Sequence, residues 1–63
     1  MTDGPEDPLR KLRHDLANPL SAILAEAQLL LLNADTLDPE VVTSLREIER
    51  LARRMRDMLQ GKT

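Results

Sequence analysis

Apolar residues recur along the chain in two segments, at steps of three and four positions. In the first segment these positions are Leu9, Leu12, Leu16, Leu20, Ile23, Ala27 and Leu30, and in the second they are Val41, Leu45, Ile48, Ala52, Met55 and Leu59. Because an α-helix turns by about 100° per residue, such steps keep each set on one side of a helix. The pattern predicts two amphipathic helices, over about residues 8–33 and 38–60, and it indicates no strand.

The residues that flank these segments carry signals for helix ends. Asp-Pro pairs at residues 7–8 and 38–39 each place an aspartate at the N-cap and a proline at the first helical position. Residues 33–37 form a short connection, with Asn33 expected as the C-cap of the first helix. A connection this short makes the two helices antiparallel neighbours. We therefore expect one all-α domain over residues 1–63, an antiparallel helical hairpin.

Four further apolar residues widen the two stripes: Leu24, Leu31, Leu51 and Met58. A lone hairpin would leave one side of each stripe in water, whereas two copies paired into a four-helix bundle would bury both sides. A chain of 63 residues also buries little of its surface, and it usually needs a disulfide, a metal or a partner chain. The absence of cysteine and the single histidine exclude disulfides and thiolate or multi-histidine metal sites. We therefore expect a homodimer.

Composition excludes several classes of partner. Nine basic and eleven acidic residues give a formal net charge of −2, and no aromatic side chain is present to stack on bases, so nucleic acid is not an expected partner. The longest apolar run, residues 29–32, is too short to cross a bilayer. With glycine only at positions 4 and 61, the sequence has no phosphate-binding loop. We expect a cytoplasmic chain that contacts no membrane and holds no cofactor or metal of its own.

The candidate chemistry lies in the first helix, around the only imidazole of the sequence. His14 is about 155° around the helix from the centre of the apolar stripe, so its side chain should point to water. Asn18 lies one turn further along the same face. Pro19 breaks a local rule, because a proline inside a helix removes a backbone hydrogen bond and clashes with the Asp15 carbonyl, at a cost of about 3 kcal/mol. A costly kink beside an exposed histidine is typical of a functional site.

Plainer interpretations stay open on pattern alone. A single exposed histidine on a helix is most often a solvated surface residue. Asn18-Pro19 is also a good helix start, so the first helix could begin there. A basic cluster on the second helix usually forms a solvated face paired with nearby acidic residues; here it comprises Arg50, Arg53, Arg54 and Arg56.

The stretch in question reads His14-Asp15-Leu16-Ala17-Asn18-Pro19-Leu20. It resembles the H-box of the dimerisation and phosphoacceptor domain of sensor histidine kinases, in which a histidine precedes an acidic residue and a Pro-Leu pair follows. Ala17 departs from that motif, because the family often has Arg or Lys at this position. The second helix is also similar to that of the family, in Ile48, Arg50-Leu51 and Met58-Leu59, so the resemblance covers residues 9–60.

The resemblance implies a role for each residue of the motif. His14 would be the phosphoacceptor, attacking the γ-phosphorus of ATP through Nε2. Asp15 would bind the other ring nitrogen or take up its proton, and so fix the nucleophilic tautomer. Asn18 would orient a water that dephosphorylates a partner, and Pro19 would supply the kink. Nearby cationic side chains could contact the phosphate or the partner: Arg53, Arg54 and Arg56.

The resemblance also implies partners. His14 would pass its phosphoryl group to an aspartate in the receiver domain of a response regulator. The phosphoryl group would come from an ATP-binding kinase domain, acting in cis or in trans with ATP and Mg²⁺, and this chain would be inactive without it. Two alternatives remain: a non-catalytic homodimeric helical-bundle module, and a regulator that docks on kinases.

Overall fold

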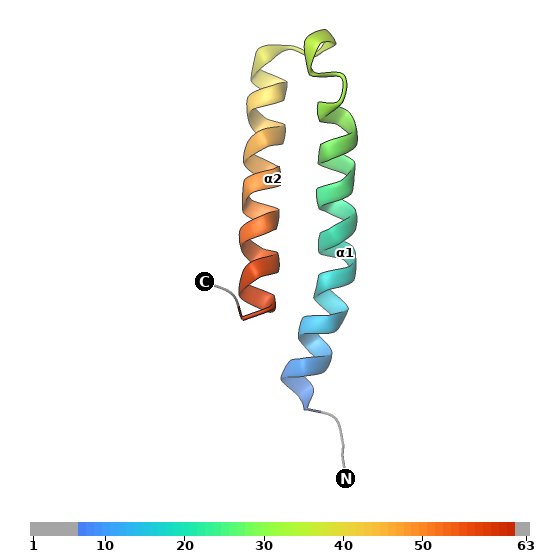
Figure 1. Cartoon of the computed structure of the whole chain (residues 1–63), viewed down its shortest axis with the longest axis vertical. Helices are drawn as coiled ribbons and strands as arrows, with labels where there is room; N and C mark the ends of the chain where they lie inside the picture. The colour runs from blue at the N-terminus through green and yellow to red at the C-terminus, as the bar shows by residue number, and fades with distance from the viewer. Residues whose placement is uncertain (1–6, 62–63) are drawn as a thin grey trace.

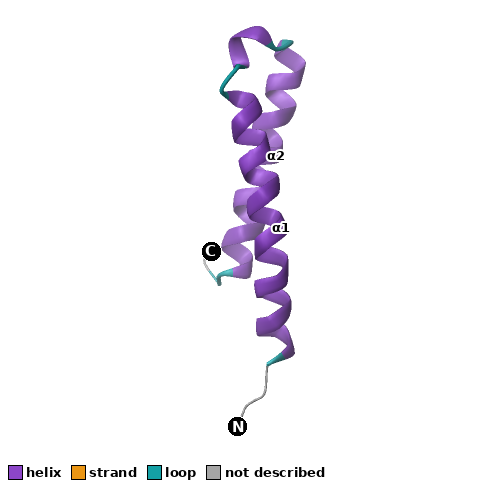
Figure 2. Ribbon diagram, turned by 90° about the vertical axis from the view of Figure 1, so that its right-hand side faces the viewer, coloured by secondary structure: helices purple, strands orange, loops and turns teal. Residues whose placement is uncertain are grey.

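The computed structural model describes residues 7–61, and these form an antiparallel helical hairpin (Figure 1). Helix α1 spans Pro8–Leu31, the short 3-10 helix η1 spans Ala34–Thr36, and helix α2 spans Pro39–Leu59. Figure 2 shows the two long helices crossing at a small angle, with loops only at the turn and the ends. The described residues contain no strand, so the predicted all-α hairpin is confirmed.

The helix starts form as the Asp-Pro pairs predict. Asp7 Oδ1 accepts a hydrogen bond from the backbone N–H of Leu9, and Asp38 Oδ1 accepts one from the N–H of Glu40, both over 3.0 Å. Each bond satisfies a backbone donor that has no partner inside its helix. At the other end of α2, Gly61 has a φ of 77°, a left-handed conformation that glycine adopts without steric cost.

The turn differs from the prediction by one residue. Leu32, not Asn33, is the C-cap of α1, and its N–H donates to the carbonyl of Gln28 over 3.2 Å. Asn33 instead precedes η1, where its carbonyl accepts bonds from the N–H and the hydroxyl of Thr36, over 2.9 and 2.8 Å. The C-cap prediction for Asn33 was therefore wrong, because this residue serves the 3-10 turn that follows the helix.

Helix α1 continues without a break through Pro19. The alternative in which the first helix starts at Asn18-Pro19 was therefore wrong. Proline has no N–H, so the Asp15 carbonyl has no donor from the residue four positions on. This backbone hydrogen bond is missing between the third and fourth turns of α1, directly after His14.

The core of the hairpin is one row of side chains between the helices. Leu20, Leu24 and Ala52 form a buried cluster, against which Leu59 packs, and Ala27 and Leu45 are the other buried apolar residues. Ten other residues of the predicted stripes stay between 43% and 65% exposed: Leu9, Leu12, Leu16, Ile23, Leu30, Val41, Ile48, Leu51, Met55 and Met58. A single hairpin therefore covers one side of each apolar stripe and leaves the other side open.

Candidate functional site

His14 lies in the second turn of α1 with its side chain exposed, as its position opposite the apolar stripe predicts. Within residues 7–61 no hydrogen bond or ion pair joins the imidazole to another side chain. Asn18, one turn further along, is exposed on the same face. The two residues that the sequence singled out therefore lie side by side on a surface open to a partner.

The carboxylate of Asp15 is engaged by a residue that the sequence analysis missed. Lys11 Nζ lies 2.7 Å from Asp15 Oδ2, one helical turn before it. This hydrogen bond, together with the negative charge of Asp15, raises the pKa of Lys11 above its usual value. The four-residue spacing of opposite charges could have revealed the pair. In this conformation the Asp15 carboxylate, which was expected to accept a hydrogen bond from His14, is paired with the ammonium group of Lys11.

The register of the hairpin sets what lies near His14. Gln28 Nε2 donates to Glu49 Oε2 over 3.3 Å between the helices, and Leu20 meets Ala52 in the core. Counting along both helices from Leu20 and Ala52 brings His14 level with the last turn of α2. That turn contains Arg56.

The arginines of α2 are largely paired within their own helix. Arg53 binds Glu49 over 3.1 Å, Arg56 lies 3.8 Å from Asp57, and Arg54 is exposed. These arginines are positioned near the end of the hairpin that carries His14, but the structure records no contact from them to the imidazole among the described residues. Their suggested contact with a phosphate or a partner stays a prediction.

Glu49 is the residue that ties the two helices together on one side. Its Oε2 atom accepts from both Gln28 and Arg53, and its side chain is only 21% exposed. Gln28 follows His14 by fourteen residues, which leaves the two about 40° apart around α1. The polar bridge of Gln28, Glu49 and Arg53 therefore lies on the side of the hairpin that carries His14.

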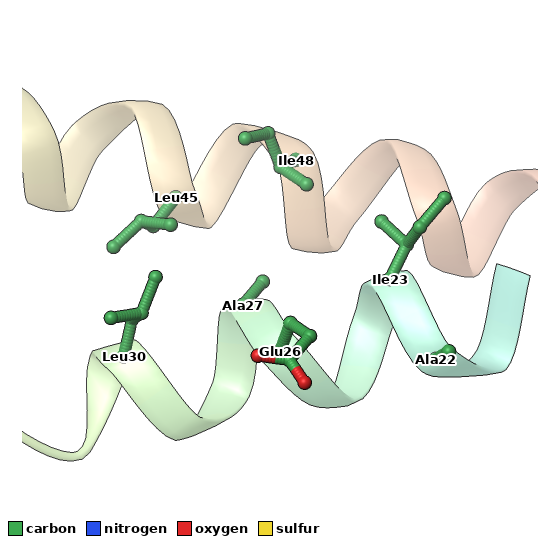
Figure 3. Close-up of a pocket in the computed structure, with 7 residues that line it drawn as sticks. All are labelled: Ala22, Ile23, Glu26, Ala27, Leu30, Leu45 and Ile48. Carbon is green, nitrogen blue, oxygen red and sulfur yellow. The ribbon is translucent and has the colours of Figure 1, made fainter. Parts of the chain in front are cut away.

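The opposite side carries an open apolar groove of about 360 Å³. Its lining is apolar apart from one carboxylate: Ala22, Ile23, Glu26, Ala27 and Leu30 from α1, and Leu45 and Ile48 from α2. Figure 3 shows Ile23, Ala27 and Leu30 pointing toward α2 across this groove. Ile23 follows His14 by nine residues, about 180° around α1, so the groove and the imidazole face opposite ways.

Two other kinds of site are absent from the described part of the chain. Residues 7–61 contain no group of three or more His, Cys, Asp or Glu side chains that could hold a metal ion. Neither α1 nor α2 combines the length and the apolar character that a membrane crossing requires.

Comparison with known protein families identifies both helices. The model of the His Kinase A (phospho-acceptor) domain matches residues 7–61, which include both helices and the stretch from His14 to Leu20. No curated protein and no solved structure matches the chain.

Proposed function

Because the chain belongs to the family of His Kinase A phospho-acceptor domains, we propose that His14 is the residue that takes up the phosphoryl group. Domains of this family serve as phosphoacceptor and dimerisation modules of histidine kinases. The observation that carries the proposal is the exposure of His14 on the side of α1 opposite the apolar groove. A dimer formed through the groove leaves the imidazole open to a phosphoryl donor.

The proposed dimer is a four-helix bundle of two hairpins. Its interface would take up apolar side chains that one hairpin leaves about half exposed, among them Leu16, Ile23, Ile48 and Met55. Burial of such surface contributes about 25 cal/mol for each Å², which is the main favourable term available to a chain this small. The homodimer thereby supplies stability that the shallow core of a single hairpin lacks.

The proposed reaction transfers the γ-phosphoryl group of ATP to Nε2 of His14. A kinase domain acting in cis or in trans would bind ATP and Mg²⁺ and bring the phosphorus to the imidazole. Such transfer depends mainly on in-line positioning and on stabilisation of charge, which an imidazole held on a long helix can meet without further covalent chemistry. Asp15 would accept a hydrogen bond from Nδ1–H and so favour the tautomer with a lone pair on Nε2.

The phosphoryl group would next pass to an aspartate in the receiver domain of a response regulator. We expect this domain to dock along the His14 side of α1 and on the facing part of α2. Leu29 and Leu32 support such a surface, because both are exposed and lie within about 60° of His14 around α1. Asn18 would then orient a water for dephosphorylation of the regulator, and the arginines near the end of α2 would contact the phosphate or the partner.

Phosphorylation in trans tests the proposal. The chain is incubated with a histidine kinase ATP-binding domain and ATP labelled at the γ-phosphate, and we expect an acid-labile, base-stable label that His14→Gln abolishes. An Arg10→Gln variant, changed one turn before His14, serves as the matched control and should keep the label. If several kinase domains leave the wild-type chain unlabelled, the chain is a dimerisation module without phosphotransfer. If it inhibits those kinases and His14→Ala inhibits equally well, it is a docking regulator.

A further inference from the structure

The ion pair of Lys11 and Asp15 competes with the role proposed for Asp15. Lys11 Nζ and Asp15 Oδ2 are 2.7 Å apart, and the side chains are 69% and 56% exposed. Asp15 neighbours His14 in sequence, and Lys11 precedes His14 by one turn, about 60° around α1. One carboxylate therefore has two possible partners on the same stretch of helix, an ammonium group and an imidazole.

We propose that Lys11 is a positioning residue for the reaction of His14, which holds the Asp15 carboxylate away from the imidazole and so limits the population of the nucleophilic tautomer. The inference rests on the proposed function of His14. Lys11 touches neither ATP nor the reacting atoms in this scheme. It acts through Asp15, by deciding how often that carboxylate is free to accept from Nδ1–H.

The reacting step shows why the carboxylate matters. The lone pair of Nε2 forms the bond to the γ-phosphorus of the nucleoside triphosphate. The bond from that phosphorus to the bridging oxygen breaks, and its electron pair leaves on the diphosphate. Nδ1 keeps its proton, and positive charge develops on the ring. A carboxylate hydrogen-bonded to Nδ1–H stabilises this charge, whereas a carboxylate neutralised by Lys11 does so less.

The ion pair of Lys11 and Asp15 can break and re-form frequently. Both side chains are solvated, and the lysine precedes the acid along the helix, which is the less favourable order for a pair four residues apart. Other charges near His14 stay in place when Lys11 is changed: Arg10 and Arg13 on α1, and the pair of Arg56 and Asp57 in the facing end of α2. Surface pairs of this type shift an equilibrium by about 1.5- to 2-fold.

Nitrogen-15 NMR of the imidazole measures the effect without any kinase. The chain has a single histidine, so its ring signals need no assignment. At a pH where the ring is neutral, Lys11→Gln should raise the ratio of the Nδ1–H to the Nε2–H tautomer by about 1.5- to 2-fold. In an Asp15→Asn background the same change should leave the ratio unaltered. An equal shift in both backgrounds would mean that the lysine acts directly on the ring, and it would overturn the proposal.

Phosphorylation rates supply the second readout. Lys11→Gln should speed labelling in trans by about the same factor, whereas Lys11→Arg, which keeps the ion pair, should give no increase. Arg10→Gln removes an equal charge one turn before His14 and keeps the Lys11–Asp15 pair, so it should match the wild type. Labelling of the wild type with no difference between Lys11→Gln and Lys11→Arg would overturn the inference alone. An unlabelled wild type would instead overturn the proposed function.

Discussion

Gln28 on α1 donates a hydrogen bond to Glu49 on α2 across the hairpin, over 3.3 Å. Glu49 also accepts from Arg53 in its own helix, so its carboxylate binds two other side chains. The bridge lies on the side that carries His14, and the apolar groove lies on the other. The hairpin thus has one side on which a polar bridge joins the helices, and an apolar side that is open for a second copy.

Removal of this bridge should loosen the register more than it lowers stability. We expect Glu49→Ala to reduce the free energy of unfolding by about 0.5–1 kcal/mol, because a partly solvated hydrogen bond contributes little. Gln28→Ala should add little further loss in the Glu49→Ala background, since both changes remove the same bond. Chemical denaturation followed by circular dichroism measures both, and additive losses from the two single variants would contradict a shared bond.

The buried row should be far more sensitive than the exposed leucines. Leu45→Ala should cost about 2–5 kcal/mol, because Leu45 is buried between the helices and its truncation leaves a cavity. Leu29→Ala, at an exposed position, should change the free energy of unfolding by less than about 0.5 kcal/mol. Equal losses in the two variants, measured by denaturation, would mean that the core is not where the structure has it.

The groove is expected to be the dimer interface. Ile48→Asp would bury an unpaired charge if two hairpins meet through the groove, so it should convert the dimer to a monomer in analytical ultracentrifugation. Leu29→Asp introduces the same charge on the side of His14 and should leave the dimer intact. A wild-type chain that sediments as a folded monomer at micromolar concentration would rule out the bundle.

A substitution at Pro19 should affect the stability of α1 and the reaction of His14 in different ways. Pro19→Ala restores a backbone donor to the Asp15 carbonyl, so the helix should gain up to about 3 kcal/mol. The rate of phosphorylation of His14, or of the later transfer, should change at the same time if the local distortion sets the position of the imidazole. A variant that is less stable than the wild type would mean that α1 depends on the proline, contrary to its position inside the helix.

Acid should weaken one further ion pair. Arg50 donates to Glu47 over 2.9 and 2.6 Å, and these hydrogen bonds lower the pKa of Glu47 below its usual value of 4.5. A lowered pKa in the folded state stabilises the fold above about pH 4.5, and this contribution is lost as the pH falls through the folded value. The difference in Tm between wild type and Glu47→Gln should therefore shrink as the pH is lowered below 4.5, whereas a difference that does not change with pH would exclude this pair as its cause.

The sequence predicted the hairpin well because its signals are local. Asp-Pro pairs specify helix starts through bonds within two residues, and apolar steps of three and four specify the buried side of each helix. The C-cap prediction for Asn33 was wrong because a residue that follows a helix can either cap that helix or begin the next turn. The bridge from Gln28 to Glu49 could not be predicted, since it depends on the register between helices to within one residue.

Less of the candidate site could be predicted from the sequence. Helical periodicity correctly made His14 exposed, because rotation around a helix follows from residue number alone. The spacing of Lys11 and Asp15 is that of an ion pair one helical turn apart, so this pair could have been predicted. The periodicity does not say whether the Asp15 carboxylate prefers Lys11 or His14, and the structure shows it paired with Lys11.

Ala27 and Ala52 are the least exposed apolar residues of the hairpin, at 3% each. A methyl group is the smallest side chain that still fills space, so almost any replacement at these two points is an enlargement. A larger side chain at either position would push the two helices apart. The packing of α1 against α2 therefore depends on a small side chain at each of these two positions.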